Sequence, residues 1–357
     1  MKLSILPLVF VLALFACSSD GNNDSDNNPQ PDTLYYPTTD ATWETVTAES
    51  LGWNTAAFSD LYAFLELKNT KSFMILYNGR IVSEQYFNGH SAQSLWYWAS
   101  AGKTLTTACT GIAAEQGLLN VNAAVSTYLG AGWTSLPANK EQLIKVSNLL
   151  TMTSGLDDSL GDSVAPENLQ YVADAGTRWA YHNVYVKLQD VVSEVANKTW
   201  ATYFNENLRD KIGMNGFWFS SGEDLSVYRS NTKSMARFGL LMSRKGKWFD
   251  QQIVPEAFCE AATQTSQNLN RAYGYMWWIN GESTYRLPQV QFQFNGSLIP
   301  SAPADMYCAL GKNDQKIYIV PSRKLVIIRM GDSADGTNFA LSDFDDALWQ
   351  KINAVIQ

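Results

Sequence analysis

Ser100 and Lys103 are the residues of this chain whose types and spacing point most directly to chemistry. They lie three positions apart at the start of a stretch in which apolar residues recur at helical spacing. Residues three apart on a helix share one face, so the amine can reach the hydroxyl without help from a histidine. The pair therefore predicts a serine nucleophile with a lysine as its general base.

The helix that must position this pair is expected to begin at Ser100 and to end near Gly117, where a left-handed residue would stop it. In its first turn, backbone NH groups and the positive end of the helix dipole would favour an oxyanion. A desolvated Lys103 would lose part of its preference for charge and become a usable base. The apolar face follows the i, i+3, i+4, i+7, i+8 rule with Leu105, Ala108, Cys109, Ile112 and Ala113.

The same spacing occurs a second time, at Ser230 and Lys233. About one such match is expected by chance in a chain of this length, at average residue frequencies of roughly 5 to 7%. Spacing alone cannot choose between the two pairs, and only Ser100 is followed by an amphipathic helix pattern. The surrounding segments must show which of the two pairs is catalytic.

Several segments, in order, resemble landmarks of the beta-lactamase-related serine hydrolases. Residues 149–156, Leu-Leu-Thr-Met-Thr-Ser-Gly-Leu, resemble the "LLTxTSGL" signature, and Ser100 stands at the matching distance before them. Residues 176–183 resemble the Tyr-x-Asn segment, while 235–239 and 273–278 resemble later landmarks. This family includes class C beta-lactamases, DD-peptidases, family VIII esterases and 6-aminohexanoate-dimer hydrolases. The resemblance implies an α+β fold in which an antiparallel sheet flanked by helices meets a mostly helical lobe at the active site.

The resemblance also implies roles for individual residues. Ser100 would be the nucleophile and Lys103 the general base, while Tyr181 would shuttle the proton to the leaving group, its pKa lowered by the neighbouring cation. Asn183 would orient Lys103 or the substrate carbonyl. His182, between them, is expected to point away from both towards the surface or a supporting position, if the segment is extended.

One signature departs from the penicillin-recognising members. Their Lys-Thr-Gly, which binds a substrate carboxylate, is replaced here by Ala309-Leu310-Gly311, so the charge and the hydroxyl are both missing from this part of the substrate pocket. Gly311 remains where a backbone must approach a ligand closely, and the NH of Lys312 would join that of Ser100 in the oxyanion hole. Catalysis is therefore expected to be kept and penicillin recognition lost, unless the Lys312 side chain replaces the absent cation.

Other hydrolase classes find little support in the sequence. The chain contains two histidines and no Gly-x-Ser-x-Gly elbow, which disfavours a Ser-His-Asp enzyme. Histidines and cysteines with metal-ligand spacing are absent, as is a phosphate-binding glycine loop, so neither a metal nor another cofactor is expected. The net charge of -8 opposes nucleic-acid binding by the folded domain.

The first residues predict a compartment. Residues 1–16 have the basic start and apolar run of a signal peptide, and Leu-Phe-Ala-Cys at 14–17 matches the lipobox at which Cys17 is lipidated. Residues 17–44 are predicted to be a disordered, solvated tether before a hydrolase domain at 45–357. We expect a lipid-anchored protein of the bacterial envelope, on the periplasmic or surface face of the outer membrane.

The remaining pattern predicts how the domain is assembled. Strands at 73–76 and 80–86 flank the hairpin signal Asn78-Gly79, and later strands at 273–279, 316–320 and 325–330 would join the same sheet. Residues from about 104 to 247 would form the helical lobe inserted between them.

Three functions stay open at this point. The first is a lipid-anchored serine hydrolase that cleaves a small-molecule or short-peptide ester or amide through a Ser-Lys-Tyr acyl-enzyme. The second is a true class C-like beta-lactamase or a DD-peptidase acting on cell-wall peptides, and the third is an inactive binding lipoprotein on the same fold.

Overall fold

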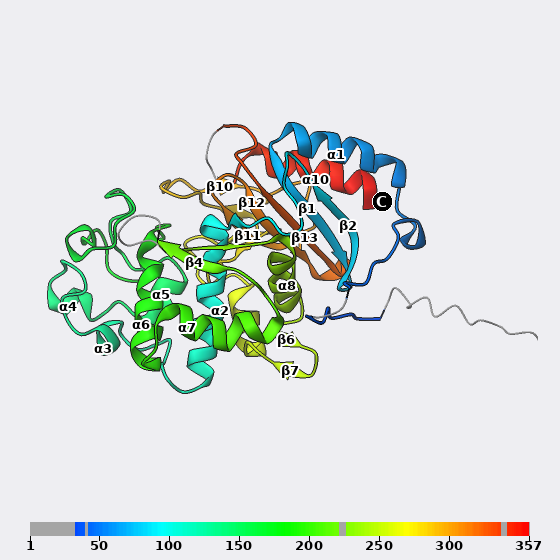
Figure 1. Cartoon of the computed structure of the whole chain (residues 1–357). Helices are drawn as coiled ribbons and strands as arrows, with labels where there is room; N and C mark the ends of the chain where they lie inside the picture. Colours follow the sequence, from blue (N-terminus) through cyan, green and yellow to red (C-terminus); the bar gives the residue numbers. More distant parts are fainter. Residues whose placement is uncertain (1–32, 40–41, 221–225, 337–340, 357) are drawn as a thin grey trace, which may run out of the picture. The chain divides into compact units, whose positions relative to one another are not determined.

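A six-stranded antiparallel sheet joins strands from both ends of the chain (Figure 1). The computed structural model describes residues 33–39, 42–220, 226–336 and 341–356. The strand order is β2-β1-β13-β12-β11-β8, and the central pairing of β1 with β13 confirms that early and late strands share one sheet. The strands are β1 (Thr70–Tyr77), β2 (Arg80–Tyr86), β8 (Trp278–Ile279), β11 (Tyr307–Gly311), β12 (Gln315–Val320) and β13 (Leu325–Gly331).

Two predictions for the sheet, a hairpin turn at Asn78-Gly79 and a strand at 273–279, have different outcomes. Asn78 and Gly79 have φ of 48° and 90°, as a tight hairpin with two left-handed residues requires, so the β1–β2 hairpin is confirmed. The strand predicted at 273–279 is wrong in its extent, because only its last two residues pair with β11. The chain doubles back instead, with Tyr273 bridging to Trp278 around a left-handed Met276. A short apolar run is buried in either geometry, so its composition does not distinguish them.

Helices cover both faces of the sheet (Figure 1). On one face α1 (Phe58–Leu67) and α10 (Asp343–Ile356) lie side by side, with the Phe64 and Phe344 rings stacked at 5.8 Å. On the other, α8 (Thr232–Ser243) packs against β1, β12 and β13. A β-carbon at Gly239 of α8 would stand 2.5 Å from the Val326 side chain, so this glycine permits the close approach.

In the segment predicted as a helical lobe, most of the regular elements are helices, but the last of them, α8, packs on the sheet and so lies outside such a lobe. The centre of the segment is α2 (Lys103–Glu115), which packs against α6 (Val186–Ala196) and is buried along most of its length. Strands β4 and β5 add a small sheet with β3, in the order β3-β5-β4. The other helices and strands of the described residues, in chain order, are η1 (Glu49–Leu51), η2 (Thr55–Ala57), β3 (Trp96–Tyr97), η3 (Ala99–Gly102), α3 (Ser126–Leu129), α4 (Ala138–Glu141), α5 (Val146–Leu150), η4 (Pro166–Asn168), η5 (Asn183–Tyr185), α7 (Trp200–Phe204), η6 (Asn205–Arg209), η7 (Asp210–Ile212), β4 (Phe217–Ser220), β5 (Ser226–Ser230), β6 (Lys247–Trp248), β7 (Gln251–Gln252), α9 (Glu256–Ala262), β9 (Thr284–Tyr285), β10 (Phe294–Asn295) and η8 (Pro321–Arg323).

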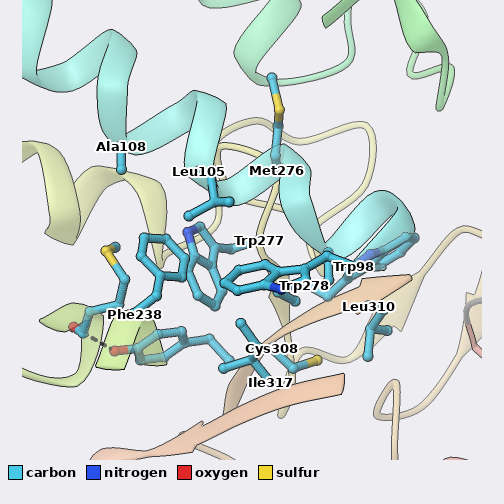
Figure 2. Packing of buried hydrophobic residues seen from close by; sticks show 14 of the residues in the cluster. Trp98, Leu105, Ala108, Phe238, Met276, Trp277, Trp278, Cys308, Leu310 and Ile317 are labelled. Atoms are coloured by element: carbon cyan, nitrogen blue, oxygen red, sulfur yellow. Dashed lines mark hydrogen bonds between the residues drawn. The ribbon is translucent and has the colours of Figure 1, made fainter. Parts of the chain in front are cut away.

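The buried core includes Trp98 and Leu105, which flank the Ser100 turn in the sequence (Figure 2). Leu105 of α2 points towards Trp277, and Leu310 of β11 lies close to Trp98 in the same buried cluster. Each of these four side chains is at most 1% exposed. Apolar burial of this kind holds α2 against the sheet and thereby fixes the turn that precedes it.

The folded domain begins before the predicted boundary at residue 45. Trp43 is buried and its indole NH donates to the Gly79 carbonyl at 2.7 Å, while the Tyr35 NH donates to the Asn78 carbonyl at 3.1 Å. Arg237 donates to the carbonyl of Pro37 at 2.8 Å. The tether prediction is therefore wrong for 33–39 and 42–44, because aromatic side chains within this polar stretch find apolar partners.

The signal peptide, Cys17 and tether residues up to 32 lie outside the described residues. In the part of the chain that the structure describes, no helix is both long and apolar enough to cross a bilayer.

Candidate active site

Ser100 and Lys103 lie together at the junction of η3 and α2. The Lys103 Nζ donates a hydrogen bond to Ser100 Oγ at 2.8 Å. The helix prediction needs one correction, since the α-helix starts at Lys103 and Ser100 belongs to the 3₁₀ turn before it. Side chains at i and i+3 eclipse in a 3₁₀ turn, which aligns this pair. The turn is entered through Ala99 with φ of 47°, an uncommon backbone conformation for a residue with a β-carbon.

The Lys103 amine is held among aromatic rings. It is 3% exposed, and its Nζ lies 4.9 Å from the centre of the Tyr181 ring and 4.3 Å from that of Tyr185. Among the described residues, no carboxylate lies within 4 Å of this amine. Burial lowers the pKa of Lys103 from 10.5 to about 7, with the nearby Asp162 carboxylate acting in the opposite direction. A large fraction of the amine is thus neutral near pH 7.

Tyr181 stands beside the same serine, close enough for the Ser100 hydroxyl to influence the pKa of its phenol. Its ring stacks on Trp278 at 5.9 Å and meets Tyr273 edge-on. Burial raises the pKa of Tyr181 to about 12, and the neighbouring Ser100 hydroxyl has a smaller effect in the opposite direction. The predicted lowering of this pKa is therefore wrong, because desolvation outweighs a neighbouring amine that is itself only partly charged. The phenol stays protonated at neutral pH.

The 149–156 segment positions Tyr181 through its backbone. The Met152 carbonyl accepts from the Ala180 NH at 2.9 Å, and the Thr153 carbonyl accepts from the Gly176 NH at 2.7 Å. Gly155 has φ of 78°, and a β-carbon there would lie 2.1 Å from the Ala173 carbonyl oxygen. The signature thus encodes a tight support for the strand-like segment that leads to Tyr181.

Asn183 and His182 both line the cavity in front of Ser100. The Asn183 amide donates to Asp162 Oδ1 at 2.8 Å, so its observed partner is this carboxylate. His182 is 4% exposed, so the surface position is ruled out, and it forms part of the cavity wall; the direction of its side chain relative to Tyr181 and Asn183 stays a prediction. The alternation of an extended strand does not continue here, because η5 begins at Asn183. Burial also lowers the pKa of His182.

The end of β11 approaches the Ser100 turn closely. A β-carbon at Gly311 would stand 2.3 Å from the Trp98 carbonyl oxygen and 3.0 Å from the Ala101 nitrogen. Gly311 therefore permits the close approach of the backbone at Trp98 and Ala101, whereas the sequence predicts the close approach of a ligand. Ala309 and Leu310 are buried within the sheet and do not line the cavity, which corrects their assignment to the substrate pocket. The first residue after β11, Lys312, does line it.

The cavity has a volume of about 320 Å³. Sequence reasoning missed Tyr185 beside Lys103, the acidic loop at 157–162 and a hairpin tip at 287–290. The sequence does indicate the acidic loop, since carboxylates follow the 149–156 signature within a Gly- and Ser-rich stretch. The hairpin lies more than 100 residues further on, and nothing in its sequence indicates that it lines the cavity. The lining residues are Ser100, Asp158, Gly161, Asp162, Tyr181, His182, Asn183, Trp278, Leu287, Pro288, Gln289, Val290, Lys312 and Leu341.

The second Ser-x-x-Lys pair has a structural role. Ser230 also precedes a helix, α8, so the prediction that only Ser100 is followed by an amphipathic helix is wrong. Ser230 is fully buried, where its Oγ accepts from the Trp98 indole NH at 2.8 Å and donates to the Asn231 carbonyl. Lys233 forms an ion pair with Glu84 at 3.3 Å. In the described ranges, no group of three or more His, Cys, Asp or Glu side chains is arranged to hold a metal ion.

Comparison with known proteins agrees with this arrangement. Residues 70–347 match the sequence model of the family described as Beta-lactamase. The chain belongs to this family. Its fold is accordingly that of the beta-lactamases and penicillin-binding proteins, and it is a hydrolase of the serine type.

Individual relatives are distant. An uncharacterized protein of Alkalihalophilus pseudofirmus is 25% identical over 301 residues, which cover 73% of this chain and 83% of that protein. A candidate 6-aminohexanoate-dimer hydrolase from Bacillus anthracis superposes with a TM-score of 0.67 at 19% identity, over 90% of this chain and 88% of the other. EstCE1, a hydrolase with promiscuous acyltransferase activity, superposes with a TM-score of 0.61 at 13% identity, over 87% and 99%. At these identities the structural likeness establishes the fold alone.

Proposed function

We propose that this protein hydrolyses an ester or amide bond through a Ser-Lys-Tyr acyl-enzyme mechanism. The observation that carries the proposal is the 2.8 Å contact between Ser100 Oγ and a buried Lys103 amine whose pKa is about 7. A neutral amine at that distance can take the proton of the hydroxyl as Oγ attacks the substrate carbonyl.

The other residues complete the reaction. The backbone NH groups of Ser100 and Lys312 would donate to the oxyanion of the tetrahedral intermediate. Tyr181, protonated at neutral pH and adjacent to Ser100, would pass a proton from the Lys103 ammonium to the departing alcohol or amine. The acyl group then remains on Ser100 Oγ, and a water molecule, deprotonated by the same amine, releases it as a carboxylic acid. Asn183 would keep Asp162 at the cavity wall.

The substrate is proposed to be a small ester or a short-peptide amide. The cavity of about 320 Å³ suits a small molecule, and Ala309 and Leu310 supply no anchor for a penicillin carboxylate. A beta-lactamase or DD-peptidase activity is the second candidate, and it rests on the Lys312 side chain at the cavity. A catalytically inactive binding protein would not require a desolvated lysine amine that is hydrogen-bonded to a serine hydroxyl.

We also propose that the protein is attached to the bacterial envelope through a lipid on Cys17, and that its domain binds no nucleic acid. The supporting observations are the lipobox at residues 14–17 and the net charge of -8. Metabolic labelling with a radioactive fatty acid tests the anchor, and a Cys17→Ser variant should lose the label.

A fluorophosphonate probe tests the catalytic proposal. Wild type and Ser230→Ala should both be labelled, whereas Ser100→Ala should not. Ser230 is not expected to react with the probe, because its hydroxyl oxygen accepts a hydrogen bond from the Trp98 indole. Ser100→Ala should also lose hydrolysis of a nitrophenyl ester. Labelling that persists in Ser100→Ala would end the assignment of this nucleophile.

A further inference from the structure

The β9–β10 hairpin supplies an apolar part of the catalytic cavity from a segment with no catalytic residue. Its strands, Thr284–Tyr285 and Phe294–Asn295, pair antiparallel, and the Tyr285 and Phe294 rings stack at 5.3 Å. At its tip, Leu287, Pro288 and Val290 are half-buried and line the cavity together with Ser100. The hairpin therefore presents aliphatic surface to whatever binds at the nucleophile.

Hydrogen bonds on both sides of the tip fix its position. On one side the Asn270 amide, which is 1% exposed, accepts from the Arg286 NH at 3.0 Å and donates to the Arg286 carbonyl at 3.2 Å. On the other side, Gln291 Nε2 donates to the Trp179 carbonyl at 2.9 Å, two residues before Tyr181. The tip is thus tied to the segment that carries a catalytic group.

The cavity lining divides by chemistry. The acidic loop and the 181–183 segment contribute carboxylates, imidazole and amide, and Lys312 an ammonium. The hairpin tip contributes mainly aliphatic side chains, with one exposed amide at Gln289, and Trp278 contributes an indole. An uncharged aliphatic chain packed against Leu287 and Val290 covers no polar side-chain atom of either residue, while a charged group there would lose hydration without compensation. The volume of about 320 Å³ is at the lower end for ligand cavities, which suits a short chain and excludes a lipid-length one.

We infer that the 287–290 tip selects the substrate by binding a short, uncharged aliphatic acyl group, with Leu287 and Val290 setting its length and Gln291 positioning the tip. This inference rests on the proposed ester or amide hydrolysis and names its acyl specificity. Leu287 and Val290 act by contact with the chain, whereas Gln291 acts through the backbone at Trp179.

The test is a chain-length profile with nitrophenyl esters of increasing acyl length on the full protein. In wild type, kcat/KM should rise roughly fourfold for each added methylene from acetate to butyrate and then fall, as expected for methylenes transferred into an apolar site of limited depth. The double variant Leu287→Ala/Val290→Ala should flatten this rise and move the optimum to longer chains. Val290→Trp should make acetate the preferred ester.

Variants at two further positions separate an effect on acyl-chain specificity from a general disturbance of the hairpin structure. Phe292→Ala is the matched control, because Phe292 belongs to the same hairpin, is 66% exposed and does not line the cavity; its profile should equal that of wild type. Gln291→Ala should raise KM for butyrate several-fold more than KM for acetate, and Gln291→Glu, which keeps the size but lacks the donor, should behave in the same way.

Fluorophosphonate labelling of Ser100 accompanies every variant. Wild type that is not labelled would refute the proposed hydrolysis itself. Normal labelling in all variants, with a chain-length profile that stays unchanged in Leu287→Ala/Val290→Ala and in Val290→Trp, would overturn only the acyl-selection inference.

Discussion

The Lys103 amine lies 4.3 Å from the centre of the Tyr185 ring and, among the described residues, within ion-pair distance of no carboxylate. An aromatic face attracts a cation far less than a carboxylate does, so desolvation dominates and the pKa falls to about 7. Together, Tyr181 and Tyr185 form an environment in which an ammonium can be kept or lost near neutral pH. This is the property that a lysine base needs.

Lys103→Arg is expected to be nearly as inactive as Lys103→Ala. A guanidinium keeps its proton at any pH where the protein is folded, so it cannot accept one from Ser100. Losses of about 100-fold or more are typical when a general base is removed, and kcat/KM for a nitrophenyl ester measures them. Wild-type kcat/KM should rise as pH increases through about 7, because the neutral amine is the active form. Substantial activity in the Arg variant would mean that only a positive charge is required.

Asp162→Asn should move this pH dependence to lower pH. The carboxylate raises the pKa of Lys103, so its removal lowers that pKa and the neutral amine forms at lower pH. An asparagine oxygen can still accept from Asn183, which keeps the wall in place. The pH profile of kcat/KM checks the shift. Asp174→Asn is the control, since Asp174 bonds to Lys140 and Tyr171 and lies outside the cavity, and its profile should match that of wild type.

Lys103→Met should abolish activity and stabilise the fold. The folded-state pKa of about 7 lies below the unfolded value of 10.5, so between these values the unfolded chain binds a proton that the folded chain does not. This favours unfolding increasingly as pH falls from 10.5 to 7. The melting temperature of the Met variant should therefore exceed that of wild type by the most near pH 7, and the difference should shrink towards pH 10. A difference that is constant over this range would argue against the lowered pKa.

Much of this site could be predicted from the sequence because its motifs are local. Ser100 and Lys103 are three residues apart, and the support for Tyr181 comes from backbone bonds that the 149–156 signature encodes. Burial could not be predicted, and it reverses the expected shift of the Tyr181 pKa. The contribution of residues 287–290 to the cavity wall could not be predicted either, since a hairpin of ordinary composition does not indicate which cavity it packs against.

Gly311→Ala should impair both stability and catalysis. The added carbon would lie 2.3 Å from the Trp98 carbonyl oxygen, a backbone atom that cannot move without shifting the Ser100 turn. Overpacking of this kind typically costs about 1 to 3 kcal/mol in the free energy of unfolding, which urea denaturation measures. Gly102→Ala, between Ser100 and Lys103, is the matched control. Its β-carbon would meet only ordinary contacts at 3.8 Å, so this variant should keep its stability, and the opposite ranking would contradict the packing argument.

Nitrocefin turnover should be negligible beside ester turnover. Ala309 and Leu310 carry neither a cation nor a hydroxyl and are buried within the sheet, so neither side chain can hold a substrate carboxylate. Loss of a charge-assisted hydrogen bond of about 1.5 to 3 kcal/mol should weaken acylation by a penam roughly ten- to a hundredfold. The exposed Lys312 side chain at the cavity is the remaining source of positive charge there. Lys312→Ala keeps the backbone NH and removes the ammonium, so it should leave neutral ester hydrolysis nearly unchanged. Efficient beta-lactam turnover in wild type that collapses in Lys312→Ala would instead assign the carboxylate anchor to Lys312 and favour the beta-lactamase or DD-peptidase function.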